Sequence, residues 1–113
     1  MPFLHQADIV FAYFPFEENK TIVKKRPCLV LAVDDNNKRF LAAKITTTPL
    51  NRSWAIHINT DNTDLASGYL HFESWINLNR RKQIPFSDYI FTIGTLKHDI
   101  MQSIINNIIS QRK

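Results

Sequence analysis

The stretch KKRPCLVLAV, residues 24–33, joins three cations to a proline and an apolar run. From Pro27 to Val33, polar and apolar residues do not alternate. Such a run is typical of a central strand that is buried on both faces. A strand can begin after any turn, so the positive charge is not needed to start it. The run therefore predicts the centre of a sheet, and the cations need a separate explanation.

The segments around this strand predict a mostly antiparallel β structure. Residues 34–37 (DDNN) indicate a turn, because Asp and Asn bond their own backbone and tolerate positive φ. Residues 39–46 then return as the second arm of a hairpin. Further strands are expected at 8–14, 54–58 and 89–92, with one long or two short strands at 69–78 and a polar loop at 59–67. So many short strands must curl strongly, which predicts a small SH3-like β-barrel.

The pattern changes after Gly94, where apolar residues recur at spacings of three and four. This stripe consists of Leu96, Ile100, Met101, Ile104, Ile105, Ile108 and Ile109. It predicts a C-terminal helix packed on the sheet, with Thr95 as N-cap, Asp99 in the first turn, and Arg112 and Lys113 at the C-terminal end. The expected fold is thus mainly β with a C-terminal α-helix, in one domain over residues 1–113.

The composition limits the classes of function. Hydrophobic residues make up 44% of the chain, which predicts a folded core rather than disorder. The net charge of +4 permits an anionic partner without requiring one. Cys28 is the only cysteine, so no internal disulfide can form. We see no signal peptide and no apolar run long enough to span a membrane, and we expect a cytoplasmic protein.

Metal and nucleophile sites are not indicated by the residue pattern. The histidines, which are His5, His57, His71 and His98, show no metal-ligand spacing. Cys28 lies inside an apolar run, where cysteine is usually a small buried hydrophobe. With only two glycines, the chain has no glycine-rich loop to hold phosphates. We therefore expect neither a metal nor a cofactor.

The cations at the start of residues 24–33 have one specific chemical use. An arginine just before a strand is held at the rim of a sheet, and its planar guanidinium matches two phosphate oxygens. Residues 44–49 (KITTTP) end the other arm of the hairpin and bring a lysine and threonine hydroxyls to the same edge. Alternatively, the cations belong to a solvated turn and the threonines are simply good strand formers.

Four segments together resemble the PemK/MazF family of toxins from bacterial toxin–antitoxin pairs. They are ADIVFAYFPF (7–16), KKRPCLVLAV (24–33), AAKITTTP (42–49) and IGTLKHDIMQSIINNII (93–109). The resemblance implies a homodimer that cleaves single-stranded RNA, including mRNA, at short specific sequences without a metal. It also implies neutralisation by a cognate antitoxin that has an acidic disordered tail.

The resemblance also implies roles for single residues. The family's essential arginine falls on Arg26 and its threonine on Thr46. Arg26 would stabilise the charge that grows when a ribose 2′-hydroxyl attacks the adjacent phosphorus. The residues expected to contact RNA are Lys20, Lys24, Lys25, Thr47, Thr48, Arg80, Arg81 and Lys82. Phe16, Trp54 and Trp75 are alternative stacking surfaces for bases, or else core or dimer-interface residues.

Departures from the family pattern leave the acid/base group open. The usual Gly-Asp at the start of the first strand is Ala7-Asp8 here. A family arginine falls on Asn77, and a family carboxylate, the candidate general base, falls on Asn79, which cannot take a proton. His57 and His71 are possible replacements, because histidine titrates near neutrality.

Two other functions therefore remain as alternatives. The first is a toxin like CcdB, which shares the barrel fold, binds DNA gyrase and cleaves nothing. The second is a family member that binds RNA but is catalytically impaired, as the replacements at Asn77 and Asn79 suggest.

Overall fold

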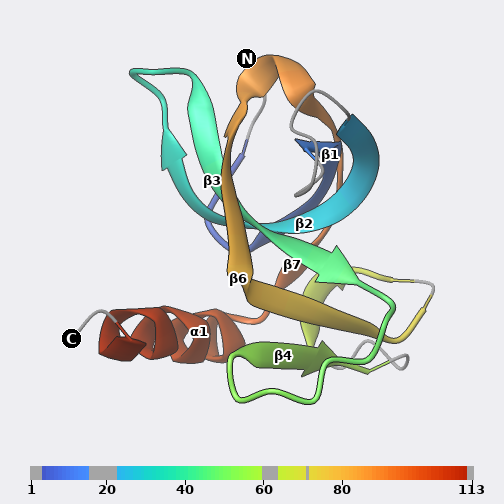
Figure 1. The fold of residues 1–113 in the computed structure, drawn as a ribbon. Helices are drawn as coiled ribbons and strands as arrows, with labels where there is room; N and C mark the ends of the chain where they lie inside the picture. The colour runs from blue at the N-terminus through green and yellow to red at the C-terminus, as the bar shows by residue number, and fades with distance from the viewer. Residues whose placement is uncertain (1–3, 16–22, 60–63, 71, 112–113) are drawn as a thin grey trace.

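The computed structural model describes residues 4–15, 23–59, 64–70 and 72–111 (Figure 1). In chain order the elements are β1 (Asp8–Pro15), β2 (Val23–Asp34), β3 (Arg39–Thr46), β4 (Ala55–Ile58), β5 (Leu65–Gly68), β6 (Ser74–Pro85), a 3₁₀ turn (Phe86–Asp88), β7 (Tyr89–Leu96) and α1 (His98–Gln111). The described part of the chain is thus mainly β with a C-terminal helix, as predicted.

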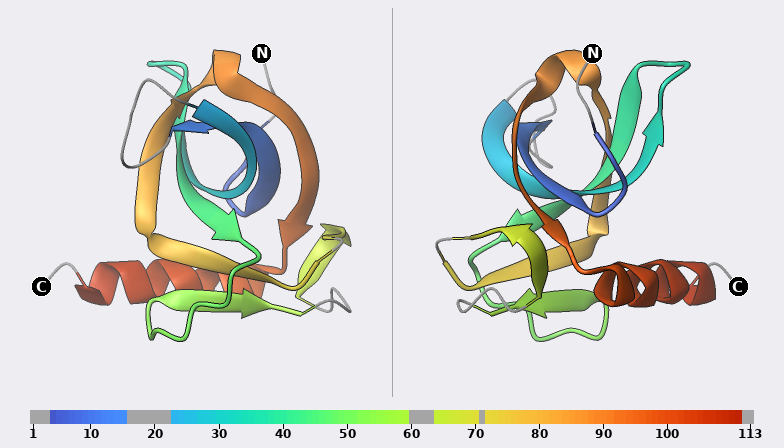
Figure 2. Two further views of the ribbon diagram at one scale, coloured as in Figure 1. Left: turned by 45° about the vertical axis from the view of Figure 1, so that its right-hand side comes forward. Right: turned by 180° about the vertical axis from the view of Figure 1, so that it is seen from behind.

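The strands form one antiparallel sheet with β2 at its centre. The strand order is β4-β6-β3-β2-β1-β7-β5. The turn predicted at 34–37 joins β2 to β3, and there the Asp34 carboxylate accepts hydrogen bonds from the backbone N–H and side-chain amide of Asn37. Figure 2 shows that the sheet coils into a small barrel-like shape. It is not a closed barrel, since no described ladder joins the edge strands β4 and β5.

Two hydrophobic cores lie on the two faces of β2. Leu29 and Leu31 point into the larger core, whereas Cys28 and Val30 point into the smaller one. All four side chains are at most 3% exposed. This alternation confirms that the apolar run after Pro27 is a central strand buried on both faces.

The helix covers the larger core at one end of the coiled sheet (Figures 1 and 2). Met101 and Ile104 are buried there, and Ile100, Ile105 and Ile108 pack against the same core. The predicted apolar stripe is therefore confirmed over these residues. Two members differ, because Leu96 is buried at the end of β7 rather than in the helix, and Ile109 is 58% exposed.

The start of the helix corrects another expectation. Thr95 is not the N-cap; it lies in β7, and its hydroxyl donates to Asp8 Oδ1 over 3.0 Å. The first helical hydrogen bond instead runs from the Met101 N–H to the Lys97 carbonyl. Thr95 is part of the strand rather than of the helix because the adjacent Leu96 N–H donates to the carbonyl of Ala7. This bond continues the pairing of β7 with the segment before β1. Asp99 lies in the first turn as predicted, and Arg112 and Lys113 lie outside the described residues.

The strand boundaries also differ from the sequence-based expectation. Part of the predicted loop at 59–67 is strand β5, which begins at Leu65. The strand predicted at 69–78 begins only at Ser74 and continues through the polar segment to Pro85. The final strand is longer than 89–92 and reaches Leu96. In each case pairing with a distant strand decides the conformation, and local composition does not reveal it.

Ala7 replaces the glycine that usually precedes the first strand in the family that the sequence resembles. Its φ is 83°, in the left-handed region that favours glycine. Its N–H donates to the Val30 carbonyl over 3.0 Å, while its carbonyl accepts from Leu96. These two bonds link β2 to β7 and hold the alanine in this conformation.

No helix in the described segments has the length and hydrophobicity needed to cross a bilayer.

Gly94 is required by a close approach between β5 and β7. It pairs with Gly68 on β5 and with Ile9 on β1. A Cβ built on Gly94 would overlap the backbone carbonyl of Ser67, which cannot move without breaking the pairing. We expect Gly94→Ala to lower the free energy of unfolding by about 1–3 kcal/mol, the usual range for overpacking. Urea unfolding followed by circular dichroism measures this difference.

The matched control adds one atom to an exposed residue of the same strand pair. Ala66 in β5 is exposed, so Ala66→Ser is expected to change the unfolding midpoint little. Equal midpoints for wild type and Gly94→Ala would show that β5 does not approach β7 this closely.

Cys28 provides a chemical test of the smaller core. Burial raises the pKa of the Cys28 thiol to about 12, so almost no thiolate forms near neutral pH. We expect iodoacetamide at pH 8 to leave the folded protein unmodified and to alkylate it fully in denaturant, as intact mass would show. Rapid alkylation of the folded protein would contradict the burial of β2.

Candidate active site

Arg26 and Thr46 lie at the same end of neighbouring strands. In the described chain, the β2–β3 ladder ends at the pair Cys28–Lys44, and Arg26 and Thr46 each lie two residues beyond it. Residues two apart on a strand point to the same face. Arg26 and Thr46 therefore share the face of Cys28 and Lys44. Both are partly exposed, so neither is closed off from solvent.

The row continues across two more strands. Thr46 pairs with Trp75 of β6, which in turn pairs with His57 of β4. On the other side, Arg26 pairs with Ala12 of β1. Directly opposed residues of antiparallel strands lie on the same face. One face of the sheet thus carries a hydroxyl, an indole and an imidazole in a row of paired residues, and the guanidinium of Arg26 lies on the same face beyond the end of the β2–β3 ladder.

A second row runs beside the first and adds a cation. Lys44 pairs with Cys28 on one side and with Asn77 on the other. Lys44 and Asn77 are partly exposed, whereas Cys28 is fully buried. Cys28 thus lies on the same face but is covered by the smaller core. Arg26 and Lys44 supply permanent positive charges on this face, and both side chains are partly exposed.

The hydroxyl of Thr46 is oriented by its own chain. Thr46 Oγ1 accepts a hydrogen bond from the Thr48 backbone N–H over 3.1 Å. This local bond restricts the rotamer of the side chain. The hydroxyl hydrogen can still be donated to a negatively charged oxygen. Thr48 therefore acts through its backbone, while the exposed Thr47 lies on the other side of the strand end.

Strand β6 bends sharply beside this site. Its register with β3 jumps between the pairs Ala43–Arg81 and Lys44–Asn77, so several residues of β6 are unpaired with β3 there. The Asn77 side-chain oxygen accepts from the Asn79 N–H over 3.0 Å and stabilises this bulge. Figure 2 shows the resulting bend between the two halves of β6. Asn77 therefore lies in the second row, and Asn79 lies in the exposed bulge.

The cationic residues expected to bind RNA are divided between the two faces. Lys24 shares the face of Arg26, whereas Lys25 alternates to the other face; both are exposed. Lys82 pairs with Ala42, two residues from Lys44 on the same face. Arg81 pairs with Ala43 and so points to the opposite face from Lys82. Arg80 lies exposed at the bulge.

His57 makes two contacts that hold its ring. Its Nε2 lies 2.8 Å from Glu73 Oε2. Its ring also stacks on Trp75, with centroids 4.9 Å apart and an interplanar angle of 24°. The His57 and Glu73 side chains remain 41% and 48% exposed. The imidazole is thus oriented but accessible to solvent.

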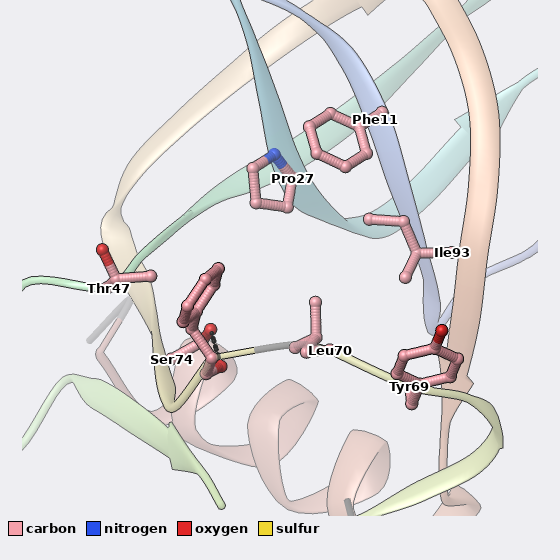
Figure 3. A pocket seen from close by; sticks show the side chains of 8 residues that line it. Phe11, Pro27, Thr47, Tyr69, Leu70, Ser74 and Ile93 are labelled. Carbon is pink, nitrogen blue, oxygen red and sulfur yellow. Dashed lines mark hydrogen bonds between the residues drawn. The ribbon is translucent and has the colours of Figure 1, made fainter. Parts of the chain in front are cut away.

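An apolar pocket of about 170 Å³ opens on the other face, next to the ends of β2 and β3 (Figure 3). Its lining comes from distant segments and consists of Phe11, Pro27, Thr47, Tyr69, Leu70, Phe72, Ser74 and Ile93. Phe72 and Tyr69 at its rim are 70% and 57% exposed. Because Pro27 and Thr47 adjoin Arg26 and Thr46 in the chain, the pocket borders the candidate site.

Three residues named from the sequence, Lys20, His71 and Phe16, fall outside the described residues. Trp54 is partly buried and lines a second pocket with Arg52 and its neighbours. Within the described segments, no three His, Cys, Asp or Glu side chains gather as metal ligands would. Neither Glu73 nor the apolar pocket was singled out in the sequence, because both depend on pairings between distant segments.

The arrangement is suited to binding an anion at the open end of the β2–β3 hairpin. The Arg26 guanidinium and the oriented Thr46 hydroxyl lie on the same face of the sheet beyond the end of the β2–β3 ladder, and Lys44 adds positive charge at that end. Such donors bind phosphate oxygens through charge-assisted hydrogen bonds. The adjacent indole and the aromatic pocket offer flat apolar surfaces.

Comparisons with known proteins agree with the fold. The chain is similar to an endoribonuclease from a mycobacterial species, with a TM-score of 0.67, 13% identity, and coverage of 93% of this chain and 86% of the other. It is similar to a mycobacterial endoribonuclease in complex with its cognate antitoxin, with a TM-score of 0.65, 13% identity and coverage of 88% and 85%. It is also similar to the Mycobacterium tuberculosis toxin MazF-mt6, with a TM-score of 0.60, 20% identity, and coverage of 89% of this chain and 96% of the other.

No curated protein sequence matches the chain significantly. A family model does match, over residues 5–111, and it describes a PemK-like, MazF-like toxin of type II toxin–antitoxin systems. That match covers both strands of the hairpin, the bent β6 and the helix. The chain therefore belongs to the family of PemK-like and MazF-like toxins of type II toxin–antitoxin systems.

Proposed function

We propose that this toxin is an endoribonuclease that cleaves single-stranded RNA without needing a metal. Arg26 and Thr46 form its active site in this proposal. The proposal is carried by the position of these two residues, which share one partly exposed face at the open end of the β2–β3 hairpin. It is supported by the family match and by the similarity of the fold to structures of mycobacterial endoribonucleases.

The proposed reaction uses the ribose itself as nucleophile. The 2′-oxygen forms a bond to the adjacent phosphorus, and the bond from phosphorus to the 5′-oxygen of the next nucleotide breaks. The products are a 2′,3′-cyclic phosphate and a 5′-hydroxyl. Negative charge grows on the non-bridging oxygens in the transition state, where Arg26 and the Thr46 hydroxyl would donate hydrogen bonds to them. Lys24, Lys44 and Lys82 on the same face would attract the RNA backbone.

The same face would also attract a partner that neutralises the toxin. A segment rich in Asp and Glu would be attracted by the charges that attract RNA, so it would compete for Arg26 and Lys44. One similar structure holds an endoribonuclease in complex with its cognate antitoxin. We extend this to a cognate antitoxin with an acidic tail, and to a homodimer as the family resemblance implies.

The central experiment measures RNA cleavage in EDTA. Wild type is expected to cut a mixed-sequence single-stranded RNA and to leave cyclic phosphate ends, while Arg26→Ala loses about 10²–10³-fold in rate, as expected for an oxyanion donor. Arg39→Ala is the matched control, since Arg39 lies at the other end of the β2–β3 ladder and pairs with Asp34. A 2′-deoxy substitution at the cut site is expected to abolish cleavage.

The outcomes separate the alternatives. Intact RNA across varied sequences would contradict the proposal. Salt-sensitive RNA binding without product would identify an impaired family member. Inhibition of gyrase supercoiling by a protein that leaves RNA intact would identify a toxin like CcdB.

Thr46 supplies a second prediction, because its hydroxyl and its shape can be separated. Thr46→Val keeps the β-branched shape but removes the donor, and we expect about 10- to 100-fold slower cleavage from the lost bond to a charged oxygen. Thr46→Ser keeps the donor and is expected to retain most of the activity. The cleavage rates of the two variants are compared after their thermal unfolding midpoints have been shown to match that of the wild type. Equal rates for the Val and Ser variants would show that the hydroxyl takes no part.

A further inference from the structure

The chain lacks a carboxylate at Asn79, yet it places a histidine–carboxylate pair beside the candidate site. Glu73 Oε2 lies 2.8 Å from His57 Nε2, and the imidazole stacks on Trp75. Trp75 is also the direct partner of Thr46 in the sheet. The pair is therefore connected to Thr46 through a single residue.

From this juxtaposition we infer that His57 is the general acid of the site and that Glu73 is its positioning residue. The inference rests on the proposed RNA cleavage. Glu73 holds the Nε2 side of the ring, and this leaves Nδ1 as the nitrogen that transfers a proton. Stacking on the indole fixes the plane of the ring. A carboxylate that orients a histidine in this way is a recurrent arrangement in acid–base catalysis.

The spacing of the sheet allows this role. Neighbouring strands lie about 4.8 Å apart, so Thr46 on β3 and His57 on β4 are separated by about 10 Å across β6. The two side chains and a phosphodiester held by Thr46 can bridge this distance above the indole. Among the described residues of the paired row Thr46, Trp75 and His57, the imidazole is the one acid–base side chain.

The proton transfers balance as follows. The 2′-hydroxyl loses its proton to water as its oxygen attacks phosphorus. The 5′-oxygen departs with the electron pair of the broken bond and takes the proton from the protonated His57. The imidazole is then reprotonated by solvent, to which its exposure gives access. Each turnover therefore leaves the enzyme unchanged.

An exposed histidine–carboxylate pair can also be merely structural, tying β4 to the segment before β6. The two roles differ in one respect. A general acid matters only when the leaving oxygen needs a proton, whereas a structural contact affects every substrate equally. Replacing the 5′-bridging oxygen by sulfur makes a leaving group that needs no proton, so it separates the two.

The test uses full-length protein and one RNA that the wild type cleaves, made with either oxygen or sulfur at the scissile 5′ position. His57→Gln is expected to lower kcat on the oxygen substrate by about 100-fold or more, with little change in KM. Glu73→Gln should lower it to a smaller extent. Both variants should cleave the sulfur substrate at nearly the wild-type rate. His98→Gln, at the exposed start of α1, is the matched control and should behave as wild type.

Arg26→Ala provides the contrasting pattern, because charge on the non-bridging oxygens must be stabilised with either leaving group. It is expected to slow both substrates. Equal losses on both substrates for His57→Gln and Glu73→Gln would overturn the inference, as would wild-type activity in His57→Gln. Those results would leave the proposed function intact. Failure of the wild type to cleave any RNA would instead overturn the proposed function, and the general acid with it.

Discussion

The burial of both faces of β2 is the constraint on which the rest of the structure depends. Cys28 and Val30 fill one core while Leu29 and Leu31 fill the other. Complete burial of one such side chain contributes about 1.5–3 kcal/mol, so this short run is a major source of stability. A slip by one residue would exchange the two cores and place each side chain against the wrong neighbours. The register of β2 is therefore strongly specified.

A specified register has a direct functional consequence. Because Cys28 faces the smaller core, Arg26 must point to that same side, and Pro27 must point to the other. The ladder with β3 ends at Cys28–Lys44, which leaves Arg26 and Thr46 at an open end where both reach solvent. The described residues of the candidate site are thus positioned by packing inside the two cores.

The bulge in β6 links these two cores. Ile76 packs in the larger core and Ile84 in the smaller one, although an even spacing would put both on the same face of a regular strand. The extra residues around Asn79 change the face that the strand presents. The same bulge brings Asn77 next to Lys44 and directs Lys82 and Arg81 to opposite faces. A polar stretch that looks unlike a strand therefore has a clear structural role.

The sequence by itself determined the main outline. The uninterrupted apolar run predicted a central strand, the Asp/Asn cluster predicted the β2–β3 turn, and the spacing of isoleucines predicted α1. These signals are local, since each depends on residues that are close together in the sequence. Family resemblance added Arg26 and Thr46 as candidate site residues. Tertiary structure decided the features that depend on pairing between distant segments. It made residues 65–68 a strand, placed the start of β6 at Ser74, and made Thr95 a hydrogen-bond partner of Asp8. It also decided that Glu73 meets His57, because residues sixteen apart are brought together only when β4 pairs with β6.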